Sequence, residues 1–334
     1  MGKKKEIPKK TAGRRRKQPL YDAVIFDIDN VLINTSRSYL DTVRWTVETY
    51  LSHGKVPLFT PAPKKMRPAL LSPKDVNFFK LLGGFNDDWD CCYGILVYLL
   101  TLPVKNRTIL SLKQQIDLKK FARKVKEQPL RVTGIVKLLG RPPFVMIEKI
   151  SRIFQEVYLG RDLFMAREDR ESMYWKKRGL ILKERLAFKK TGLMKLKDLG
   201  LSLGITTGRS HFEAEYSLKH FGIFNLFDEM TTMDEVKDAE RDQKQSLRKP
   251  HPFSVLETAR KLGADKRFLY IGDLPDDILT VHKAKKDIRI DSVSYPWLSP
   301  DAKHTTREIK KANPDFILKK PSDLIPLILG RKIR

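Results

Sequence analysis

The chain has 334 residues, of which 41% are hydrophobic, so a wholly disordered protein is excluded and one large domain with an insertion, or two domains, is expected. Its two cysteines, Cys91 and Cys92, are adjacent, which excludes a disulfide framework and a four-cysteine zinc site and fits a reducing cytoplasm. The formal net charge of +26 favours binding to polyanions, although a solvated, lysine-rich surface is the simpler interpretation.

The N-terminal segment, residues 1–19, carries part of this charge, with nine Lys or Arg residues and a single acid, Glu6. Because almost nothing in it is apolar, we expect a disordered basic tail. No apolar stretch follows the tail, so we expect no secretory signal. The longest apolar run, near Gly94–Leu102, is too short to span a bilayer, and we expect a cytoplasmic protein without membrane contact.

The first ordered element is expected at Ala23–Phe26, which is uniformly apolar and therefore predicts a buried strand. Ser36 is the expected cap of a helix in which apolar residues recur at helical spacing from Tyr39 to Leu51. A proline-rich loop over residues 53–73 follows. Beyond it, further helices are expected over roughly 73–82, 88–101, 112–127, 130–139, 143–158 and 166–176.

From Leu186 onward, helices and strands alternate. The expected helices lie at about 188–199, 211–221, 252–262 and 275–285, before a terminal helix. The expected strands are Ser202–Thr206, Phe227–Thr231, Phe268–Ile271, Ile288–Val293 and Phe316–Leu318. This alternation predicts a doubly wound, Rossmann-like α/β core with a parallel sheet, formed by residues 20–36 and 188–334. Residues 37–187 are then an inserted α-helical cap.

Carboxylates follow two of the predicted strands. Asp27 and Asp29 come after the first strand, and Asp273 comes after a later one, with Asp276 and Asp277 just beyond. In parallel sheets, functional residues gather at the carboxyl ends of the strands. One carboxylate can attack phosphorus while a second transfers a proton. Three carboxylates in one place repel one another unless a cation compensates them, and Mg²⁺ suits a site of carboxylates, phosphate and water.

Groups that bind phosphate follow another strand. Thr207 offers a hydroxyl and Gly208 a backbone N–H, both directly before a helix whose N-terminus favours an anion. Lys249, in a loop, adds a positive charge that can stabilise a phosphoryl group during transfer. Taken singly, Thr207 is more simply a helix cap and Lys249 a surface residue. The joint order of the features indicates phosphoryl transfer.

Together these segments resemble the motifs of the haloacid dehalogenase (HAD) superfamily. FDIDNVL resembles its first motif, ITTGR its second, RKPHP its third and YIGDLPDD its fourth, and they span residues 23–277. The resemblance implies a Mg²⁺-dependent phosphatase of the subfamily IA type, with an α-helical cap, that acts on a small phosphorylated metabolite.

The resemblance also implies catalytic roles. Asp27 would be the nucleophile that forms an aspartyl-phosphate, and Asp29 would be the general acid and base. Thr207 would bind the phosphoryl group, and Lys249 would stabilise both this group and the nucleophile. The dehalogenases of the family lack an acid at the position of Asp29, so its presence favours phosphoryl transfer over carbon–halogen cleavage.

The remaining implied roles concern the metal and the substrate. Mg²⁺ would be bound by Asp27, Asp273 and Asp277 with the backbone carbonyl of Asp29, and Asp276 is a weaker candidate. Apart from the resemblance, Gly208, through its backbone N–H, and Arg209 are candidates for contact with the substrate. Arg37 is a further candidate for an anionic substrate, with a surface ion pair as an equally good interpretation of either arginine.

Two other segments need separate expectations. Asn30 stands where the family has glycine, and because Asn tolerates a left-handed backbone, we expect the turn to be kept. In the cap, Gly83–Asp90 combines glycines, aromatics and acids. It loosely resembles a segment of relatives that are either possible histidinol-phosphatases or similar to phosphoglycolate phosphatases. It is either a specificity loop, with Asn86 and Trp89 at the substrate, or a helix start capped by an acid.

The leading hypothesis is therefore a phosphatase of a small phosphate monoester. A phosphomutase of the β-phosphoglucomutase type would use the same aspartates and is one alternative. The other is a phosphatase core that also binds nucleic acid through its basic tail, although no nucleic-acid-binding motif accompanies the charge.

Overall fold

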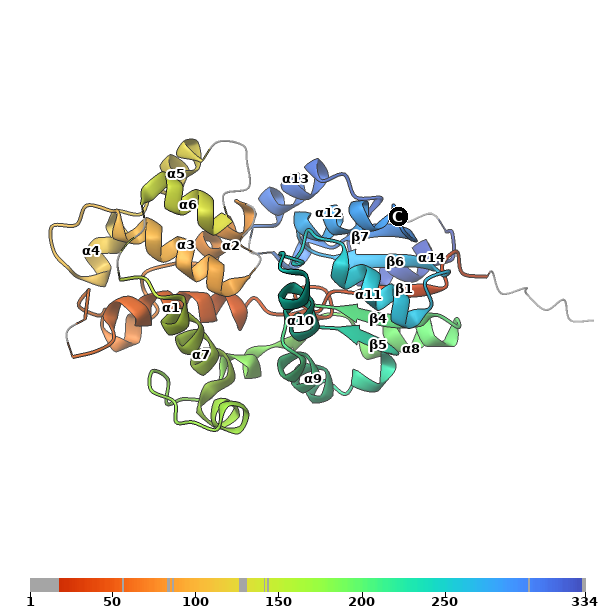
Figure 1. Ribbon diagram of the computed structural model, residues 1–334, viewed down its shortest axis with the longest axis horizontal. Coiled ribbons are helices and arrows are strands. Elements are labelled where there is room, and N and C mark those ends of the chain that lie inside the picture. Colours follow the sequence, from red (N-terminus) through yellow and green to blue (C-terminus); the bar gives the residue numbers. More distant parts are fainter. Residues whose placement is uncertain are drawn as a thin grey trace, which may run out of the picture.

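The computed structural model describes most of the chain, as two groups of elements that lie side by side (Figure 1). It covers residues 18–55, 57–82, 85, 87–125, 131–140, 142, 144–299 and 301–331. Asn86 and the basic tail through residue 17 lie outside the described residues, so the expectations for them remain predictions.

One group is built around a six-stranded sheet in the order β5-β4-β1-β6-β7-β8. The strands are β1 (Ala23–Phe26), β4 (Ser202–Thr206), β5 (Glu229–Thr231), β6 (Arg267–Gly272), β7 (Arg289–Ser294) and β8 (Phe316–Ile317). All neighbouring pairs are parallel. The chain builds outward from β1 through β4 to β5 and then returns to β6 on the other side of β1. The strand order therefore reverses beside β1, which is where ligands bind in such sheets.

Helices cover both faces of this sheet. On one face lie α8 (Lys190–Asp198), α9 (His211–His220) and α14 (Leu324–Ile328). On the other lie α11 (Phe253–Leu262) and α12 (Pro275–Ala284). Strand β1 contributes Val24 and Phe26 to the first core and Ala23 and Ile25 to the second, which explains why its sequence is apolar at every position. The expected doubly wound α/β fold is confirmed.

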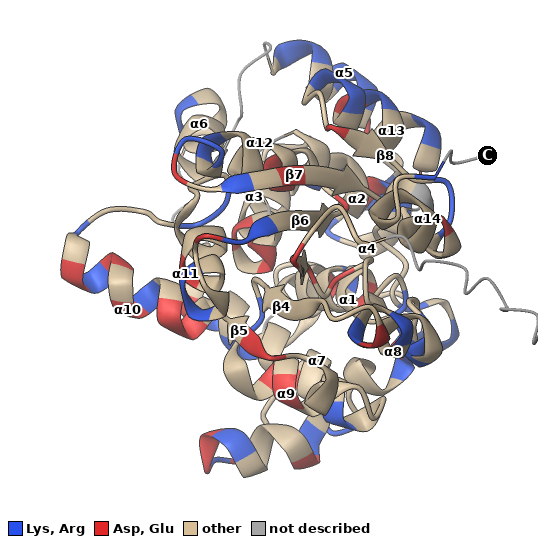
Figure 2. Cartoon of the chain, turned by 90° about the vertical axis from the view of Figure 1, so that its right-hand side faces the viewer, with Lys and Arg blue, Asp and Glu red and all other residues tan. Residues whose placement is uncertain are grey.

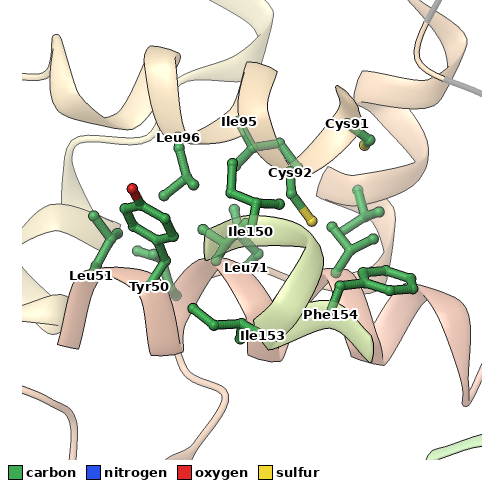
Figure 3. Packing of buried hydrophobic residues seen from close by; sticks show 14 of the residues in the cluster. Tyr50, Leu51, Leu71, Cys91, Cys92, Ile95, Leu96, Ile150, Ile153 and Phe154 are labelled. Carbon is green, nitrogen blue, oxygen red and sulfur yellow. The ribbon is translucent and has the colours of Figure 1, made fainter. Parts of the chain in front are cut away.

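The other group is helical and has its own core, at the left of Figure 1. Its elements are α1 (Tyr39–Ser52), α2 (Pro73–Leu81), α3 (Asp88–Leu100), α4 (Ile109–Gln114), α5 (Leu118–Lys124), α6 (Arg131–Leu139) and α7 (Ile147–Glu168). Figure 3 shows side chains of α1, α3 and α7 packed together, among them Tyr50, Ile95 and Ile153. Cys91 and Cys92 are free thiols in this core.

A short antiparallel pair joins the two groups. Strand β2 (Ile33–Asn34) pairs with β3 (Arg185–Leu186), so the chain enters and leaves the helical group at neighbouring points. A 3₁₀ turn, Leu180–Lys183, precedes β3. Neither short strand was expected from the sequence, because two residues carry no periodicity.

Several expected helices differ from the structure. The expected helix over 112–127 is wrong, because Asp117 caps a new helix, α5, by accepting from Lys120 N. The expected helix over 143–158 is part of a longer element, α7, which begins at Ile147, ends at Glu168 and has non-helical Gly160 inside it. The expected helix over 166–176 is wrong, because residues 169–176 are not helical. A Cβ on Gly160 would lie 2.1 Å from Gly179 N, so the close approach requires glycine there.

Other differences concern helix starts and missed helices. Helix α1 begins after Ser38 rather than Ser36, and the Ser38 side chain makes no cap hydrogen bond. The sequence did not predict α10 (Met233–Gln243) or α13 (Ala302–Lys311). Both carry many charged residues and few apolar ones, so their hydrophobic pattern is weak.

Charge is spread over the surface of the described part of the chain. Figure 2 shows Lys and Arg on peripheral helices such as α5, α8 and α13, and both signs on α10. Within the described ranges, no helix is both long and apolar enough to cross a bilayer.

Candidate active site

Asp27 lies directly after β1, the strand beside which the strand order reverses. Its backbone N–H donates to Ile271 O at 2.9 Å, and its Oδ1 accepts from Ile28 N at 2.7 Å. The residue is buried, with 8% exposure, and it lines a cavity of about 620 Å³ that opens between the two groups of elements. The structure thus places this carboxylate where parallel α/β sheets place their ligands.

The chain turns back after Asp27. Ile33 N donates to Ile28 O at 2.9 Å, and Asn30 N donates to Ile33 O at 2.7 Å. Asn30 has a φ of 55°, so the expectation that Asn supports a left-handed turn here is confirmed. Its Nδ2 donates to Asp273 Oδ2 at 3.1 Å, so Asn30 also connects this turn to the end of β6.

Lys249 connects the aspartates that follow β1 and β6. Its Nζ lies 3.3 Å from Asp27 Oδ2 and 2.8 Å from Asp277 Oδ1. It also donates to Tyr270 Oη at 2.8 Å. Burial favours the neutral amine, but the carboxylates of Asp27 and Asp277 outweigh it and raise the pKa of Lys249 well above its ordinary value. The sequence did not single out Tyr270, which lies inside an apolar strand.

Asp277 has a structural task as well as a charge. Its Oδ2 accepts from Asp273 N at 3.1 Å and from Leu274 N at 3.0 Å, at the start of α12. Its Oδ1 accepts from Lys249 and from Tyr270 Oη. A Cβ on Gly272 would lie 2.4 Å from Asp277 Cβ, so glycine is needed for this approach. Both oxygens of Asp277 therefore already accept hydrogen bonds.

The carboxylates at the strand ends repel one another unless a cation balances their charge. One oxygen from each of Asp27, Asp273 and Asp277 lies within 4.8 Å of the others, and all three residues are buried. Burial, opposed by Lys249 and reinforced by Asp277 and Asp29, raises the pKa of Asp27 to about 7. Burial and the neighbouring carboxylates of Asp277 and Asp27 raise the pKa of Asp273 well above its ordinary value.

These donors fit Mg²⁺, which takes one or two carboxylates and completes its shell with water and phosphate oxygens. Asp27 and Asp273 are the better placed for direct coordination, because both oxygens of Asp277 already accept hydrogen bonds. Asp276 lies in the first turn of α12 and is not among the residues that line the cavity.

The end of β4 supplies neutral donors. Thr207 is buried, its N–H donates to Thr231 O at 3.1 Å, and it lines the cavity together with Gly208. A Cβ on Gly208 would have Met233 Cε, at 3.9 Å, as its nearest neighbour, so the cavity is open beside this backbone. Ser210 then caps α9 in a capping box with Glu213.

Arg209 has a different place from the one expected. Its side chain is completely buried, and Nε and Nη2 donate to Asp29 Oδ1 at 3.0 and 2.6 Å. Nη1 and Nη2 also donate to the Glu184 carboxylate at 3.2 and 2.8 Å, and Nη1 donates to Ser217 Oγ at 2.7 Å. A guanidinium has five N–H groups, and here all of them bond within the protein. In this arrangement Arg209 has no donor left for a substrate.

The helical group forms the opposite wall of the cavity. Trp89 lines it, and Lys237 of α10 lies over the Trp89 ring at 4.9 Å. Asp87 caps α3 and also pairs with Arg248, the residue before Lys249, at 2.7 Å. Asp87 thus supports the interpretation of this segment as a helix start, while Trp89 lies where the specificity-loop interpretation requires.

Two further wall residues are charged. Lys80 and Asp88 both line the cavity and pair at 2.7 Å. Arg37, in contrast, is exposed and does not line the cavity.

Comparisons with known proteins agree with this geometry. The sequence model of the haloacid dehalogenase-like hydrolases matches residues 21–285. Pyrophosphatase PpaX of Bacillus pumilus is 31% identical over 134 residues, and PpaX of Bacillus velezensis is 29% identical over 134 residues. The alignments cover 40% of this chain and 54% of each relative, so the chain spans about half the length of the curated relatives it matches.

Solved structures share the fold over nearly their whole length. The phosphatase Tt82 from Thermococcus thioreducens superposes with a TM-score of 0.53 at 22% identity, over 86% of this chain and 98% of that one. A predicted phosphoglycolate phosphatase from Haemophilus somnus superposes with a TM-score of 0.51 at 16% identity, over 92% and 97%. At these identities the likeness establishes the fold alone.

Proposed function

The chain belongs to the haloacid dehalogenase-like hydrolase family, and on that premise we propose that it is a Mg²⁺-dependent phosphatase of a small phosphate monoester. The observation that carries the proposal is the position of Asp27. This buried carboxylate lies between the Lys249 ammonium and the Asp273 carboxylate, on a cavity large enough for a phosphorylated metabolite.

The reaction has two steps. In the first, an oxygen of Asp27 attacks phosphorus, the bond to the ester oxygen breaks, and that oxygen takes a proton from the Asp29 carboxylic acid. In the second, water attacks the phosphorus of the aspartyl-phosphate and gives a proton to Asp29. The acyl phosphate P–O bond breaks, which releases inorganic phosphate and restores Asp27.

The other residues bind and stabilise the phosphoryl group. Lys249 offers a positive charge 3.3 Å from the attacking carboxylate. Thr207 and the backbone of Gly208 line the same cavity, at the start of α9, and supply donors for the phosphoryl oxygens. Mg²⁺ bound by Asp27 and Asp273, with the Asp29 carbonyl and Asp277 in support, would neutralise phosphoryl charge.

Residues 37–187 are proposed as the cap over this site, and residues 20–36 with 188–334 as the catalytic core. Both groups line the cavity, since Trp89 and Lys80 face it from the helices while Asp27 and Lys249 face it from the sheet. A closed cap would exclude water from the phosphoryl group until the leaving group departs.

The experiment that tests the proposal is hydrolysis of 4-nitrophenyl phosphate by the purified protein. We expect turnover with Mg²⁺ and its loss with a chelator. Asp27→Asn should lower kcat by roughly 10³-fold or more with an unchanged circular dichroism spectrum, whereas Asp242→Asn, on the exposed side of α10, should retain activity. Turnover by Asp27→Asn at a rate comparable to that of the wild type would refute the proposal.

The substrate is then found with a panel of phosphorylated metabolites. The panel includes phosphoglycolate and pyrophosphate, because proteins similar to this chain carry those names. Release of inorganic phosphate identifies a phosphatase, whereas an isomerised sugar phosphate would identify the phosphomutase that uses the same aspartates. Binding of RNA or DNA that is lost when residues 1–19 are deleted would show that the basic tail adds a nucleic-acid function.

A further inference from the structure

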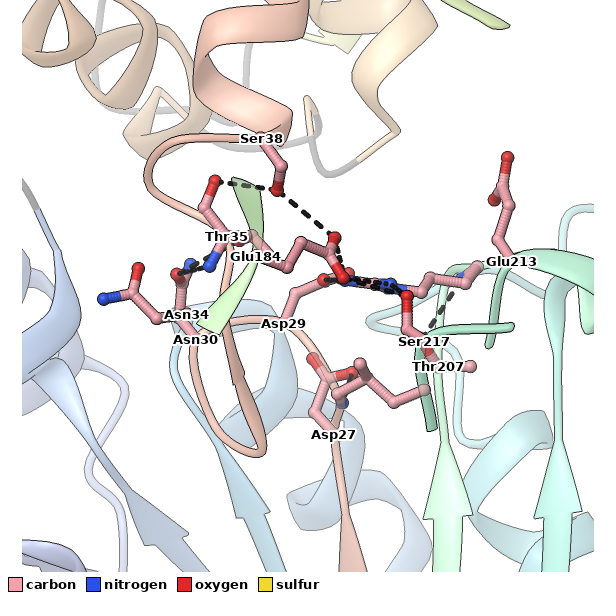
Figure 4. A network of polar contacts seen from close by, with 12 residues as sticks. Asp27, Asp29, Asn30, Asn34, Thr35, Ser38, Glu184, Thr207, Glu213 and Ser217 are labelled. Carbon is pink, nitrogen blue, oxygen red and sulfur yellow. Dashed lines mark hydrogen bonds and ion pairs between the residues drawn. The ribbon is translucent and has the colours of Figure 1, made fainter. Parts of the chain in front are cut away.

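We propose that Arg209 is a positioning residue that orients Asp29 for proton transfer, and that Glu184 couples this orientation to the helical group. The inference rests on the proposed function, in which Asp29 exchanges a proton with the leaving oxygen. It concerns a cluster defined as the Arg209 network: Arg209, Asp29, Glu184 and Ser217. Figure 4 shows Asp29, Glu184 and Ser217 connected by dashed lines across the space above Asp27.

Arg209 binds a single oxygen of Asp29. Both of its bonds to this residue, from Nε at 3.0 Å and Nη2 at 2.6 Å, end on Oδ1. Within the described part of the chain, no hydrogen bond to Asp29 Oδ2 is found. Asp29 lines the cavity, and its side chain is 29% exposed. The two bonds hold Oδ1 in place and leave Oδ2 as the oxygen that can exchange a proton with a substrate.

Arg209 is itself immobilised by its other partners. The guanidinium has no exposed surface, and its remaining N–H groups bond to Glu184 and to Ser217 Oγ. The Tyr39 ring lies 5.1 Å from the guanidinium carbon. An arginine whose five donors are all occupied is held in one orientation, so Asp29 Oδ1 is held in place with it.

Glu184 is held by a residue at the entry to the helical group and by one on α7. It lies on the segment that leaves the helical group, just before β3. Its carboxylate accepts from Ser38 Oγ at 3.2 Å and from Tyr158 Oη at 2.8 Å. Ser38 precedes α1 on the segment that enters the helical group, and Tyr158 belongs to α7. Rotation of the helical group would therefore move Glu184, and with it the partner of Arg209.

A purely structural role for this network predicts something different. A buried ion cluster can hold two segments together without any effect on proton transfer. The two roles are separated by the leaving group. An ester whose leaving group is a weak base departs without a proton, whereas a more basic leaving group needs the acid. Misplacement of Asp29 should therefore reduce the rate most for the more basic leaving groups, and a loss of structure should reduce all rates alike.

The test measures kcat/KM, which includes departure of the leaving group, for 4-nitrophenyl phosphate, phenyl phosphate and an alkyl phosphate. Arg209→Lys keeps the charge but loses the fork, and we expect its loss to be at least tenfold greater for the alkyl than for the nitrophenyl ester. Asp29→Asn should show the same order. The double variant should lose little more than Asp29→Asn alone, because both changes affect one function.

The matched control is Arg67→Lys. Arg67 pairs at 2.9 Å with Glu48, a buried acid of the helical group, and donates to Ser52 Oγ at 3.1 Å. This variant disturbs an ion pair whose residues do not line the cavity, and its losses should be the same for every ester. If Arg209→Lys does not fold, Glu184→Gln and Ser217→Ala weaken the same network with smaller changes and should show the same leaving-group order.

Three outcomes are possible. The graded loss supports the inference. An equal loss for all esters, or a double variant whose losses multiply, overturns it and leaves the proposed function standing. A wild-type protein that hydrolyses none of the esters refutes the proposed function itself.

Discussion

Two cation–carboxylate clusters lie near the proposed nucleophile, and they differ in their access to the cavity. Lys249 faces Asp27 and Asp277 on the cavity side, with 14% of its side chain exposed. Arg209 faces Asp29 and Glu184 away from the cavity, with none of its side chain exposed. The lysine is a point charge held by Asp27, Asp277 and Tyr270 at the cavity wall. The arginine is a planar fork whose five donors all bond within the protein.

The difference suggests a division of labour. Lys249 borders the cavity beside Asp27, so its charge is available to a phosphoryl group bound there. A residue that orients a second carboxylate needs rigidity, which Arg209 has. Loss of Lys249 should therefore mainly lower the rate of the reaction. Loss of Arg209 should lower the stability of the protein and impair proton transfer by Asp29.

The largest expected effect is on activity at the lysine. Lys249→Met leaves Asp27 and Asp277 without their cation and removes the charge beside the phosphoryl group, so kcat should fall by about 10³-fold. Initial rates with 4-nitrophenyl phosphate measure this. Lys286→Met, on an exposed lysine, is the matched control and should be fully active. Retention of more than a tenth of the rate by Lys249→Met would contradict the role given to Lys249.

The next effect is on stability at the arginine. Arg209→Met leaves two carboxylates facing each other, and the buried Glu184 without its ion pair, so we expect a loss of about 3–5 kcal/mol in the free energy of unfolding. Urea denaturation measures it. Lys249→Met should lose less, because its carboxylates border the cavity, where water and Mg²⁺ can reach them. A larger loss for Lys249→Met would reverse the comparison.

Mg²⁺ should stabilise the protein through the carboxylates near Lys249 and not through the Arg209 network. Mg²⁺ at about a hundredfold its dissociation constant should stabilise the protein by roughly 2.7 kcal/mol. Asp273→Asn should abolish this effect, whereas Glu184→Gln should not. Thermal unfolding with and without Mg²⁺ measures both.

Stabilisation by Mg²⁺ should also depend on pH. Since the pKa of Asp27 is raised to about 7, above its unfolded value, the charged form opposes folding and the metal-free protein gains stability as the pH falls through 7. Protons and Mg²⁺ compete for the carboxylates, so stabilisation by Mg²⁺ should be larger at pH 8 than at pH 6. Equal stabilisation at both pH values would argue against this carboxylate as a ligand.

The smallest effect concerns a glycine. Gly272→Ala forces a methyl group against Asp277 Cβ, which would lie 2.4 Å away, and should cost about 1–3 kcal/mol of stability. Gly208→Ala has room for its methyl group and should unfold within about 0.5 kcal/mol of the wild type. Similar stabilities for the two variants would show that Asp277 shifts readily.

The site around Lys249 and Asp27 was largely predictable from the sequence. Asp27 and Asp273 follow apolar runs that become neighbouring parallel strands, and a parallel sheet brings the ends of such strands together. Asn30 was expected to keep a left-handed turn, since few other residues do so at low cost, and it has a φ of 55°. These inferences depend on local sequence and on one general property of sheets.

The Arg209 network was not predictable in this way. Asp29 and Arg209 are 180 positions apart, and no motif or periodicity distinguishes Glu184 from other surface acids. Their meeting depends on how the helical group returns to the sheet. The same limit applies to Gly160, where the kink in α7 depends on contact with Gly179, a residue of the returning segment.

The central claim is that Asp27 carries the phosphoryl group, and peptide mapping tests it directly. The protein is mixed with substrate, quenched in acid within milliseconds, reduced with borohydride to mark acyl phosphates and analysed by mass spectrometry. We predict a reduced side chain at Asp27 in the wild type, formed only when substrate and Mg²⁺ are present. A mark on any other residue, or none during active turnover while Asp27→Asn still hydrolyses the substrate, would contradict the account.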